Sequence, residues 1–160
     1  FLGGGLVLNN QLINGKTGNA GAIGSLPFYN GSTQSQLITQ SSLYLLERKL
    51  SDAGHNGQHI YESPSHWSCD ERLVEDWLNE TAKGLAFATQ CAMSLLDLDG
   101  VIIDGAIPDN VKSALVNHTQ CAMQTLDMRG IAQVQISEGT VGRKAQSIGS
   151  ANLALQANYY

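Results

Sequence analysis

A glycine-rich segment near the start of the chain has the residue types and the spacing of a loop that binds a small ligand through its backbone. Three consecutive glycines open it, and further glycines recur about every third residue: Gly3, Gly4 and Gly5, then Gly15, Gly18, Gly21 and Gly24. Because glycine has no side chain, backbone amides in such a loop can approach a ligand closely. Amides exposed in this way can hydrogen-bond an anion such as a phosphate group. Glycines also build ordinary hairpins, so the spacing leaves both a phosphate contact and a purely structural role open.

A second candidate site follows an apolar run in the middle of the chain. Residues 101–103 predict a strand, and Asp104 and Gly105 come directly after it. Side chains at strand ends bind ligands in many α/β proteins, but a turn carboxylate also stabilises backbone amides. The second role is the preferred interpretation of Asp104. Together with residues 3–5, Asp104 and Gly105 are the weaker candidates for a phosphate or nucleotide contact.

The other chemistry-bearing side chains do not match an arrangement of metal ligands, or of a nucleophile with its base. His55, His59, His66 and Cys69 have suitable ligand types, but their spacing is irregular for a tetrahedral zinc site. Loop histidines in contact with solvent are the preferred interpretation. We therefore expect neither a catalytic residue nor a metal site.

The glycine-rich segment is expected to be carried by β-structure. Residues 5–8 and 11–14 predict two short strands joined by an Asn9-Asn10 turn, because asparagine tolerates the positive φ that a two-residue hairpin needs. Residues 23–28 predict a third strand, and the polar residues 29–36 predict a loop.

Helices and strands alternate along the rest of the chain. Apolar periodicity predicts helices over residues 36–52, 68–97, 110–128 and 142–157, with strands over residues 101–104 and 131–136. Ser68 and Glu71 have the spacing of a capping box, and Gly84 indicates close packing against another backbone. The continuous apolar run at 101–104 indicates a strand buried on both faces. The order predicts an α/β fold, with a mixed sheet flanked by helices, over one domain of residues 1–160.

Composition and charge exclude several classes of protein. Of the 160 residues, 42% are apolar and 14% are charged, which is typical of a folded domain. The net charge is −5 and the basic residues are scattered, so we expect no direct contact with nucleic acid or an anionic membrane. No apolar run approaches the ~20 residues that cross a bilayer, and no signal peptide is recognisable.

The three cysteines, Cys69, Cys91 and Cys121, are expected to be reduced and buried, as in a cytoplasmic protein. The chain begins within a strand pattern and without methionine, so we expect a fragment of a longer protein.

These features resemble, in their order, the C-terminal lobe of the ROK family, which contains bacterial repressors and sugar kinases. The resemblance is carried by the triple glycine, the hairpin and the loop up to Gly24, and then by the long helix, the apolar strand and the terminal helix. It implies one lobe of the actin-like ATPase (ribonuclease H-like) fold. It also implies a sugar-binding loop that contains Gly18, Asn19, Gly21, Ala22 and Ser25.

The chain departs from the ROK pattern where that pattern supplies polar groups. The family loop ends in Gly-Glu-Ile-Gly-His, whereas this loop ends in Gly-Ala22-Ile-Gly-Ser25. In the family, the Glu and the His bind sugar hydroxyls, and the His also binds zinc. A methyl group accepts no hydrogen bond, and serine is a poor zinc ligand. The cysteine-rich zinc motif is also missing, because residues 30–38 contain neither cysteine nor histidine. We therefore expect no zinc.

Three functions are compatible with this resemblance. The preferred one is the sugar-sensing, dimerising effector domain of a transcriptional regulator, which would contact DNA only through an upstream domain. The first alternative is part of an ATP-dependent sugar kinase, with ATP and magnesium as cofactors and a catalytic aspartate in an upstream lobe. The second alternative is a dimerisation module without sugar binding.

Overall fold

The computed structural model describes residues 1–63, 65–145 and 147–149. Its elements, in chain order, are β1 (Leu6–Leu8), β2 (Gln11–Ile13), the 3₁₀ turn η1 (Ile23–Ser25), β3 (Pro27–Asn30), β4 (Thr33–Gln36), η2 (Leu37–Thr39), α1 (Leu43–Asp52), α2 (His59–Glu62), α3 (Glu71–Leu96), β5 (Gly100–Ile103), α4 (Asp109–Met123), β6 (Gln135–Glu138) and η3 (Gly142–Lys144). Strands and helices alternate in the second half, so the α/β expectation is confirmed.

Three two-stranded sheets are formed by the described residues, in place of the single mixed sheet that the sequence predicts. β1–β2 and β3–β4 are antiparallel, and β5–β6 is parallel. Both strand directions are therefore present, but no hydrogen-bonded ladder joins the three pairs in the described part of the chain.

The first hairpin forms as predicted. β1 pairs with β2 so that Val7 lies opposite Leu12. The turn residues Asn9 and Asn10 have φ values of 51° and 61°, which are the positive values that a type I′ turn requires.

The segment after the glycine-rich loop differs from the prediction. Residues 23–25 form the turn η1, and the predicted strand begins only at Pro27. The predicted loop is instead the second hairpin, in which Phe28 pairs with Ser35. The prediction missed β4 because its four residues are all polar and show no alternation with apolar residues. The hairpin is held to α3 by an edge-on contact of Phe28 with Phe87, whose ring centroids are 5.5 Å apart.

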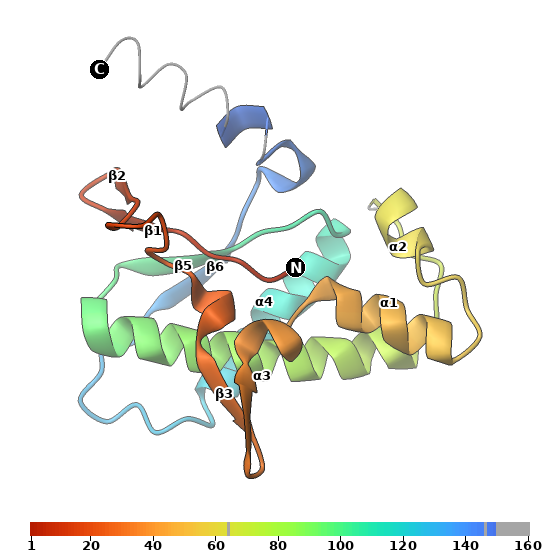
Figure 1. The fold of residues 1–160 in the computed structure, drawn as a ribbon, viewed down its shortest axis with the longest axis horizontal. Helices are drawn as coiled ribbons and strands as arrows, with labels where there is room; N and C mark the ends of the chain where they lie inside the picture. The colour runs from red at the N-terminus through yellow and green to blue at the C-terminus, as the bar shows by residue number, and fades with distance from the viewer. Residues whose placement is uncertain (64, 146, 150–160) are drawn as a thin grey trace.

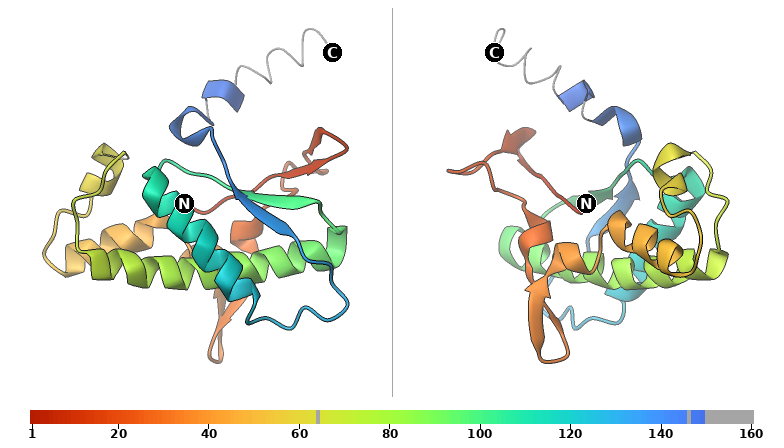
Figure 2. Two further views of the ribbon diagram at one scale, coloured as in Figure 1. Left: turned by 180° about the vertical axis from the view of Figure 1, so that it is seen from behind. Right: turned by 45° about the vertical axis from the view of Figure 1, so that its right-hand side comes forward.

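β5, α4 and β6 form a parallel strand–helix–strand unit. Gly100 lies opposite Gln135 and Ile103 lies opposite Glu138. The two long helices α3 and α4 pack against each other, and α4 crosses α3 obliquely beside the strand pair (Figure 2). The prediction of burial on both faces of β5 is wrong at Ile102, which is 73% exposed, because the helices cover one face only.

The core lies between the helices and the parallel strands. α1 contributes Leu46 and Leu50, which are fully buried. The remaining members come from α2, α3, β5, α4 and β6: Ile60, Trp77, Leu78, Ala82, Leu85, Ile103, Val111, Leu115, Val116 and Ile136. Trp77 also ties α3 to the start of α1, because its Nε1 donates to the Ser42 carbonyl at 3.1 Å.

Helix α3 starts and packs differently from the prediction. Asp70 is its N-cap and accepts a hydrogen bond from the Arg72 amide at 2.9 Å, so the predicted Ser68 cap is wrong. Asp97 ends the helix in a left-handed conformation with φ 48°. At Gly84 the predicted close packing is present, but the neighbours are the side chains of Ser41 and Leu37 rather than backbone.

Helix α4 begins at Asp109 and ends at Met123, five residues before the predicted end. The predicted last helix begins with the turn η3, and most of its remainder lies outside the described residues. Within the described ranges, no helix combines the length and the apolar character needed to cross a membrane.

Candidate functional site

The glycine-rich loop is held by its own backbone. Gly15, Gly18 and Gly21 have φ values of 73°, 77° and 78°, in the left-handed region that glycine adopts without strain. The Ala20 amide donates to the Asn14 carbonyl at 3.2 Å, and this bond closes the loop at the base. The backbone is therefore ordered by local hydrogen bonds before any ligand is considered.

Three of the glycines are needed because backbone packs against backbone. A Cβ on Gly21 would lie 2.7 Å from the Gly5 carbonyl carbon, and a Cβ on Gly4 would lie 2.7 Å from the Gly21 carbonyl oxygen. A Cβ on Gly24 would lie 2.6 Å from the Leu2 carbonyl oxygen. The triple glycine and the loop thus fit against each other, which is the structural role that the spacing left open.

The other glycines of the segment have more space. A Cβ on Gly3 or Gly18 would meet no atom within 4 Å, and a Cβ on Gly5 would meet only Leu12, at 3.8 Å. Gly18 is exposed and is required only by its positive φ.

The side chains predicted to face a sugar lie on the surface of the loop. Asn19, Ala22 and Ser25 are exposed, and the Asn19 amide donates to the Thr17 hydroxyl at 3.3 Å. The Ser25 amide donates to the Ala22 carbonyl at 3.0 Å and closes the turn η1. Ala22 precedes η1 and Ser25 ends it, so both side chains are exposed at this one turn.

The second candidate position, Asp104, binds backbone amides at the carboxyl ends of β5 and β6. Its Oδ2 accepts from the Val141 and Gly142 amides at 3.0 and 2.9 Å, and its Oδ1 accepts from the Gly105 amide at 2.8 Å. The Lys112 ammonium lies 3.5 Å from Oδ1. These contacts match the preferred interpretation of Asp104 as a carboxylate that stabilises a turn.

Lys112 is a buried charged residue of this cluster that the sequence does not single out. Its side chain is only 7% exposed, and its Nζ donates to the Gly139 carbonyl at 3.0 Å and lies 3.3 Å from Asp109 Oδ1. The spacing of Asp109 and Lys112, three residues apart in the first turn of α4, indicates an ion pair. Nothing in the sequence indicates that the lysine is buried.

The protonation of this pair follows from its surroundings. Partial burial disfavours the Asp104 anion, but the amides of Gly142, Gly105 and Val141 and the Lys112 charge outweigh that effect and hold the pKa of Asp104 below its usual value. Burial likewise disfavours the Lys112 cation, but Asp109 and Asp104 outweigh it and raise the pKa of the ammonium. Both groups are therefore charged at neutral pH.

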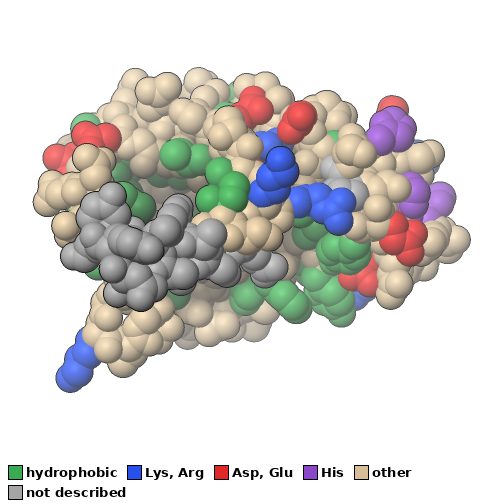
Figure 3. Space-filling view, turned by 90° about the horizontal axis from the view of Figure 1, so that it is seen from above, with side chains coloured by type: hydrophobic (Ala, Val, Ile, Leu, Met, Phe, Trp, Pro, Cys, Tyr) green, Lys and Arg blue, Asp and Glu red, His purple; other side chains and the backbone are tan. Residues whose placement is uncertain are grey.

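A shallow crevice of about 310 Å³ lies beside this cluster. Its walls come from the β5–α4 turn, the first turn of α4 and the segment that leads into η3, including Gly105, Pro108, Lys112, Val141 and Arg143. On the face that carries η3, basic and acidic side chains lie next to each other (Figure 3). Residues 3–5 do not line this crevice, so the structure does not bring all the predicted phosphate contacts into one site.

Histidine and cysteine side chains are the remaining candidates for metal ligands. Among the residues that the structure describes, no three His, Cys, Asp or Glu side chains gather in a way that could hold a metal ion. Cys69, Cys91 and Cys121 are free thiols, but the expectation that all are buried is wrong: Cys121 is exposed on α4, and the other two are half-buried.

Comparisons with known proteins identify the fold. No family model and no curated protein sequence matches the chain. Solved structures do match. A ROK family protein from Streptococcus pneumoniae TIGR4 in complex with sucrose has a TM-score of 0.70 and 16% identity, over 97% of this chain and 55% of that one. A ROK family glucokinase from Streptomyces griseus in complex with glucose and AMPPNP has a TM-score of 0.73 and 21% identity, over 96% and 57%.

A third match, a ROK hexokinase from Thermus thermophilus, has a TM-score of 0.64 and 17% identity, over 94% of this chain and 53% of that one. The chain therefore has the fold of a part of the ROK proteins, which is the fold that the resemblance implied. It spans a little over half the length of these structures.

Proposed function

We propose that this chain is the C-terminal lobe of a ROK family protein and acts there as the sugar-sensing, dimerising part of a transcriptional regulator. The observation that carries the proposal is the glycine-rich loop. Its backbone is ordered by Gly4, Gly21 and Gly24, while its exposed face presents a methyl group at Ala22 and a hydroxyl at Ser25. Two of the matching structures are complexes with sucrose and with glucose, which supports a sugar as the ligand class.

The chemistry of this face favours binding over phosphoryl transfer. A transferase must hold the reacting hydroxyl in a narrow range of positions, and a carboxylate does this by accepting hydrogen bonds from two hydroxyls. The methyl group of Ala22 accepts none, so Ser25, Asn19 and the loop backbone must supply the contacts. A sensor needs only a difference in affinity between two conformations of the protein, which a few such hydrogen bonds can provide.

The remaining parts of the proposal concern partners. DNA would be contacted by an upstream domain, because this chain carries a net charge of −5 and no basic cluster. Self-association would use α3 and α4. We propose that the protein acts in the cytoplasm without a zinc ion.

The alternative is an ATP-dependent sugar kinase. It is supported by the presence of a glucokinase and a hexokinase among the matching structures. In that case ATP and magnesium would be required, and the catalytic base would come from an upstream lobe. A dimerisation module without sugar binding is the second alternative.

A panel of neutral and amino sugars, tested with the purified full-length protein in a thermal-shift assay and by calorimetry, distinguishes these functions. The sensor predicts that at least one sugar raises the melting temperature without ATP and that no phosphorylated sugar forms when ATP and magnesium are added. Formation of a sugar phosphate would support the kinase. If no sugar raises the melting temperature, both sugar-binding functions fail and the dimerisation module remains.

A further inference from the structure

The amides at the start of η3 have the geometry of an anion-binding nest. Val141 has φ −89° and ψ −41°, and Gly142 has φ 53°, so successive residues adopt right-handed and then left-handed conformations. This alternation turns two neighbouring N–H groups toward one point, where an anion is bound. Here that point is occupied by the chain's own Asp104 carboxylate.

Three further neighbours of the nest also contact the Asp104 carboxylate or leave room for it. The Gly105 amide donates to its second oxygen, and the buried Lys112 ammonium lies 3.5 Å away. Gly139 has no room for a side chain, because a Cβ there would overlap Asp104. Asp104, itself 24% exposed, thus uses three amides and a buried cation that a phosphate group would otherwise find at this edge.

The nest that Asp104 fills lies at the edge of the strands where ligands are expected to bind. In open α/β sheets, ligands bind in the crevice beyond the carboxyl ends of the parallel strands. The crevice beside Asp104 lies at the ends of β5 and β6, and Gly105, Lys112, Val141 and Gly142 line it. Each of these four residues directs its amide or ammonium toward Asp104.

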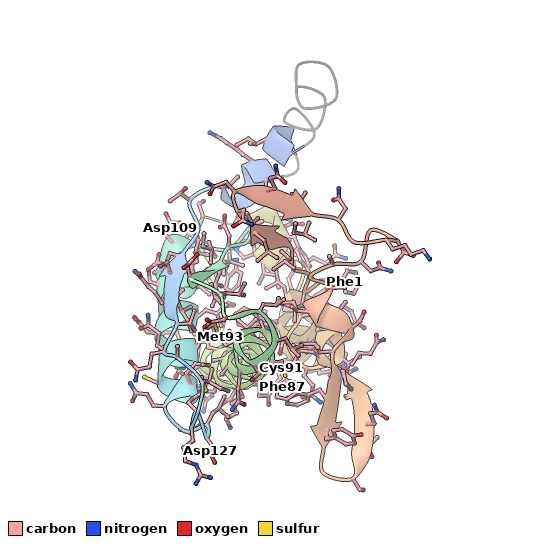
Figure 4. All side chains as sticks on the ribbon, turned by 90° about the vertical axis from the view of Figure 1, so that its left-hand side faces the viewer. Phe1, Phe87, Cys91, Met93, Asp109 and Asp127 are labelled. Atoms are coloured by element: carbon pink, nitrogen blue, oxygen red, sulfur yellow. The ribbon has the colours of Figure 1, made fainter. Side chains whose placement is uncertain are left out.

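A second acidic residue lies at the same edge. Asp109, in the first turn of α4, is 95% exposed on the outside of the molecule, and its Oδ1 lies 3.3 Å from Lys112 Nζ (Figure 4). It is close enough to add repulsion toward an incoming anion but accepts no hydrogen bond from the nest.

We infer that Asp104 is a built-in anion that closes this crevice to phosphate-bearing ligands and restricts it to ligands without a phosphate group. The carboxylate also ties the segment before η3 to β5 and α4, so the closure is part of the fold. This inference goes beyond the sugar-sensing proposal, since it concerns a different part of the surface and predicts the outcome of a different titration.

The test is an amide-resolved NMR titration with inorganic phosphate and with ATP and magnesium as probes. In the wild-type protein, the resonances of Gly105, Val141 and Gly142 should not move with either probe at millimolar concentrations. In Asp104→Gly, the same resonances should move progressively with phosphate, with an apparent affinity at least tenfold higher than in the wild type. Movement in the wild-type protein overturns the inference, as does a folded Asp104→Gly variant that binds phosphate no better.

Two further variants separate the nest from simple charge. Asp109→Asn removes a neighbouring negative charge but leaves the nest occupied, so phosphate binding should stay at the wild-type level; a gain equal to that of Asp104→Gly would contradict the inference. Asp104→Ala also removes the acceptor from the nest and replaces the glycine variant if that one does not fold; it should bind phosphate more tightly than the wild type does. Sugar titrations followed at residues 15–25 report on the proposed function separately.

Discussion

Gly21 and Gly18 form a matched pair that tests how the glycine-rich loop is held. The two residues have nearly the same φ, 78° and 77°, so replacement by alanine imposes the same backbone strain on both. They differ in their surroundings. A Cβ on Gly21 would lie 2.7 to 2.8 Å from backbone atoms of Gly5 and Leu6, whereas a Cβ on Gly18 would meet nothing within 4 Å.

The expected losses of stability follow from these two terms. A left-handed conformation destabilises an alanine by about 1–2 kcal/mol. The lower entropy of the unfolded alanine chain offsets about 0.4–1 kcal/mol of this. Gly18→Ala should therefore lower the free energy of unfolding by about 1 kcal/mol. Gly21→Ala carries the same strain and an overlap with a strand backbone. Overpacking typically adds about 1–3 kcal/mol, so the total loss should be about 2–4 kcal/mol.

Urea denaturation followed by circular dichroism measures this difference. With a slope of about 2 kcal/mol per molar urea, a difference of about 2 kcal/mol moves the midpoint of Gly21→Ala about 1 M below that of Gly18→Ala. Equal midpoints would refute the reasoning, because they would mean that the loop does not pack against the backbone of Gly5 and Leu6.

Three other predictions concern the scaffold and its charges. Gly84→Ala should lower the melting temperature, because the new methyl group would overlap Ser41 Oγ. This loss should exceed the gain of about 1 kcal/mol that alanine brings to a helix. A higher melting temperature in a thermal melt would contradict this packing. Asp70→Ala should lower the melting temperature measurably and Ser68→Ala should not, since Asp70 caps α3. A larger loss in Ser68→Ala than in Asp70→Ala would contradict this and would make Ser68 the N-cap. Because the folded state depresses the pKa of Asp104, its stabilisation is fully present above about pH 4 and is lost as the pH falls through the folded pKa. Unfolding curves should therefore show Asp104→Asn less stable than the wild type at pH 7 and the gap narrowing below about pH 4; a gap that does not change with pH would contradict the assignment.

Elements with strong local preferences could be predicted from the sequence. The first hairpin follows from asparagines that tolerate positive φ, and α3 follows from a long apolar periodicity. β5 follows from its run of β-branched residues, and β6 follows from the alternation that puts Val134 and Ile136 on one face. Their boundaries moved by one to four residues, since the end of a strand depends on pairing with its neighbour and not on its own residues.

Features that depend on tertiary contacts could not be predicted. The polar strand β4 forms because it pairs with β3, whose Phe28 packs against α3. Ile102 is exposed because α3 and α4 cover only one side of β5, which a run of apolar residues does not indicate. The burial of Lys112 on α4 likewise depends on contacts with Asp104, which follows β5, and with Gly139, which follows β6.

The sugar-binding role of Ala22 and Ser25 stays a prediction, and both residues are exposed at the turn η1. The sequence pattern left open whether the glycines give a ligand access to the backbone or have a structural role. Three of them allow two backbone segments to touch, and only the distances between those segments reveal this.

The central claim, that the face of the loop containing Ala22 binds a sugar, is tested most directly by calorimetric titration of the best sugar from the panel into the wild type and into Ala22→Glu. A carboxylate at this position adds charge-assisted hydrogen bonds of about 1.5–3 kcal/mol, so Ala22→Glu should bind the sugar about tenfold more tightly or better. Ala53→Glu places the same substitution at an exposed alanine directly after α1, outside the loop, and should leave the affinity within about threefold as the control. Unchanged affinity in a folded Ala22→Glu variant would contradict the account, because the sugar would then bind elsewhere or not at all.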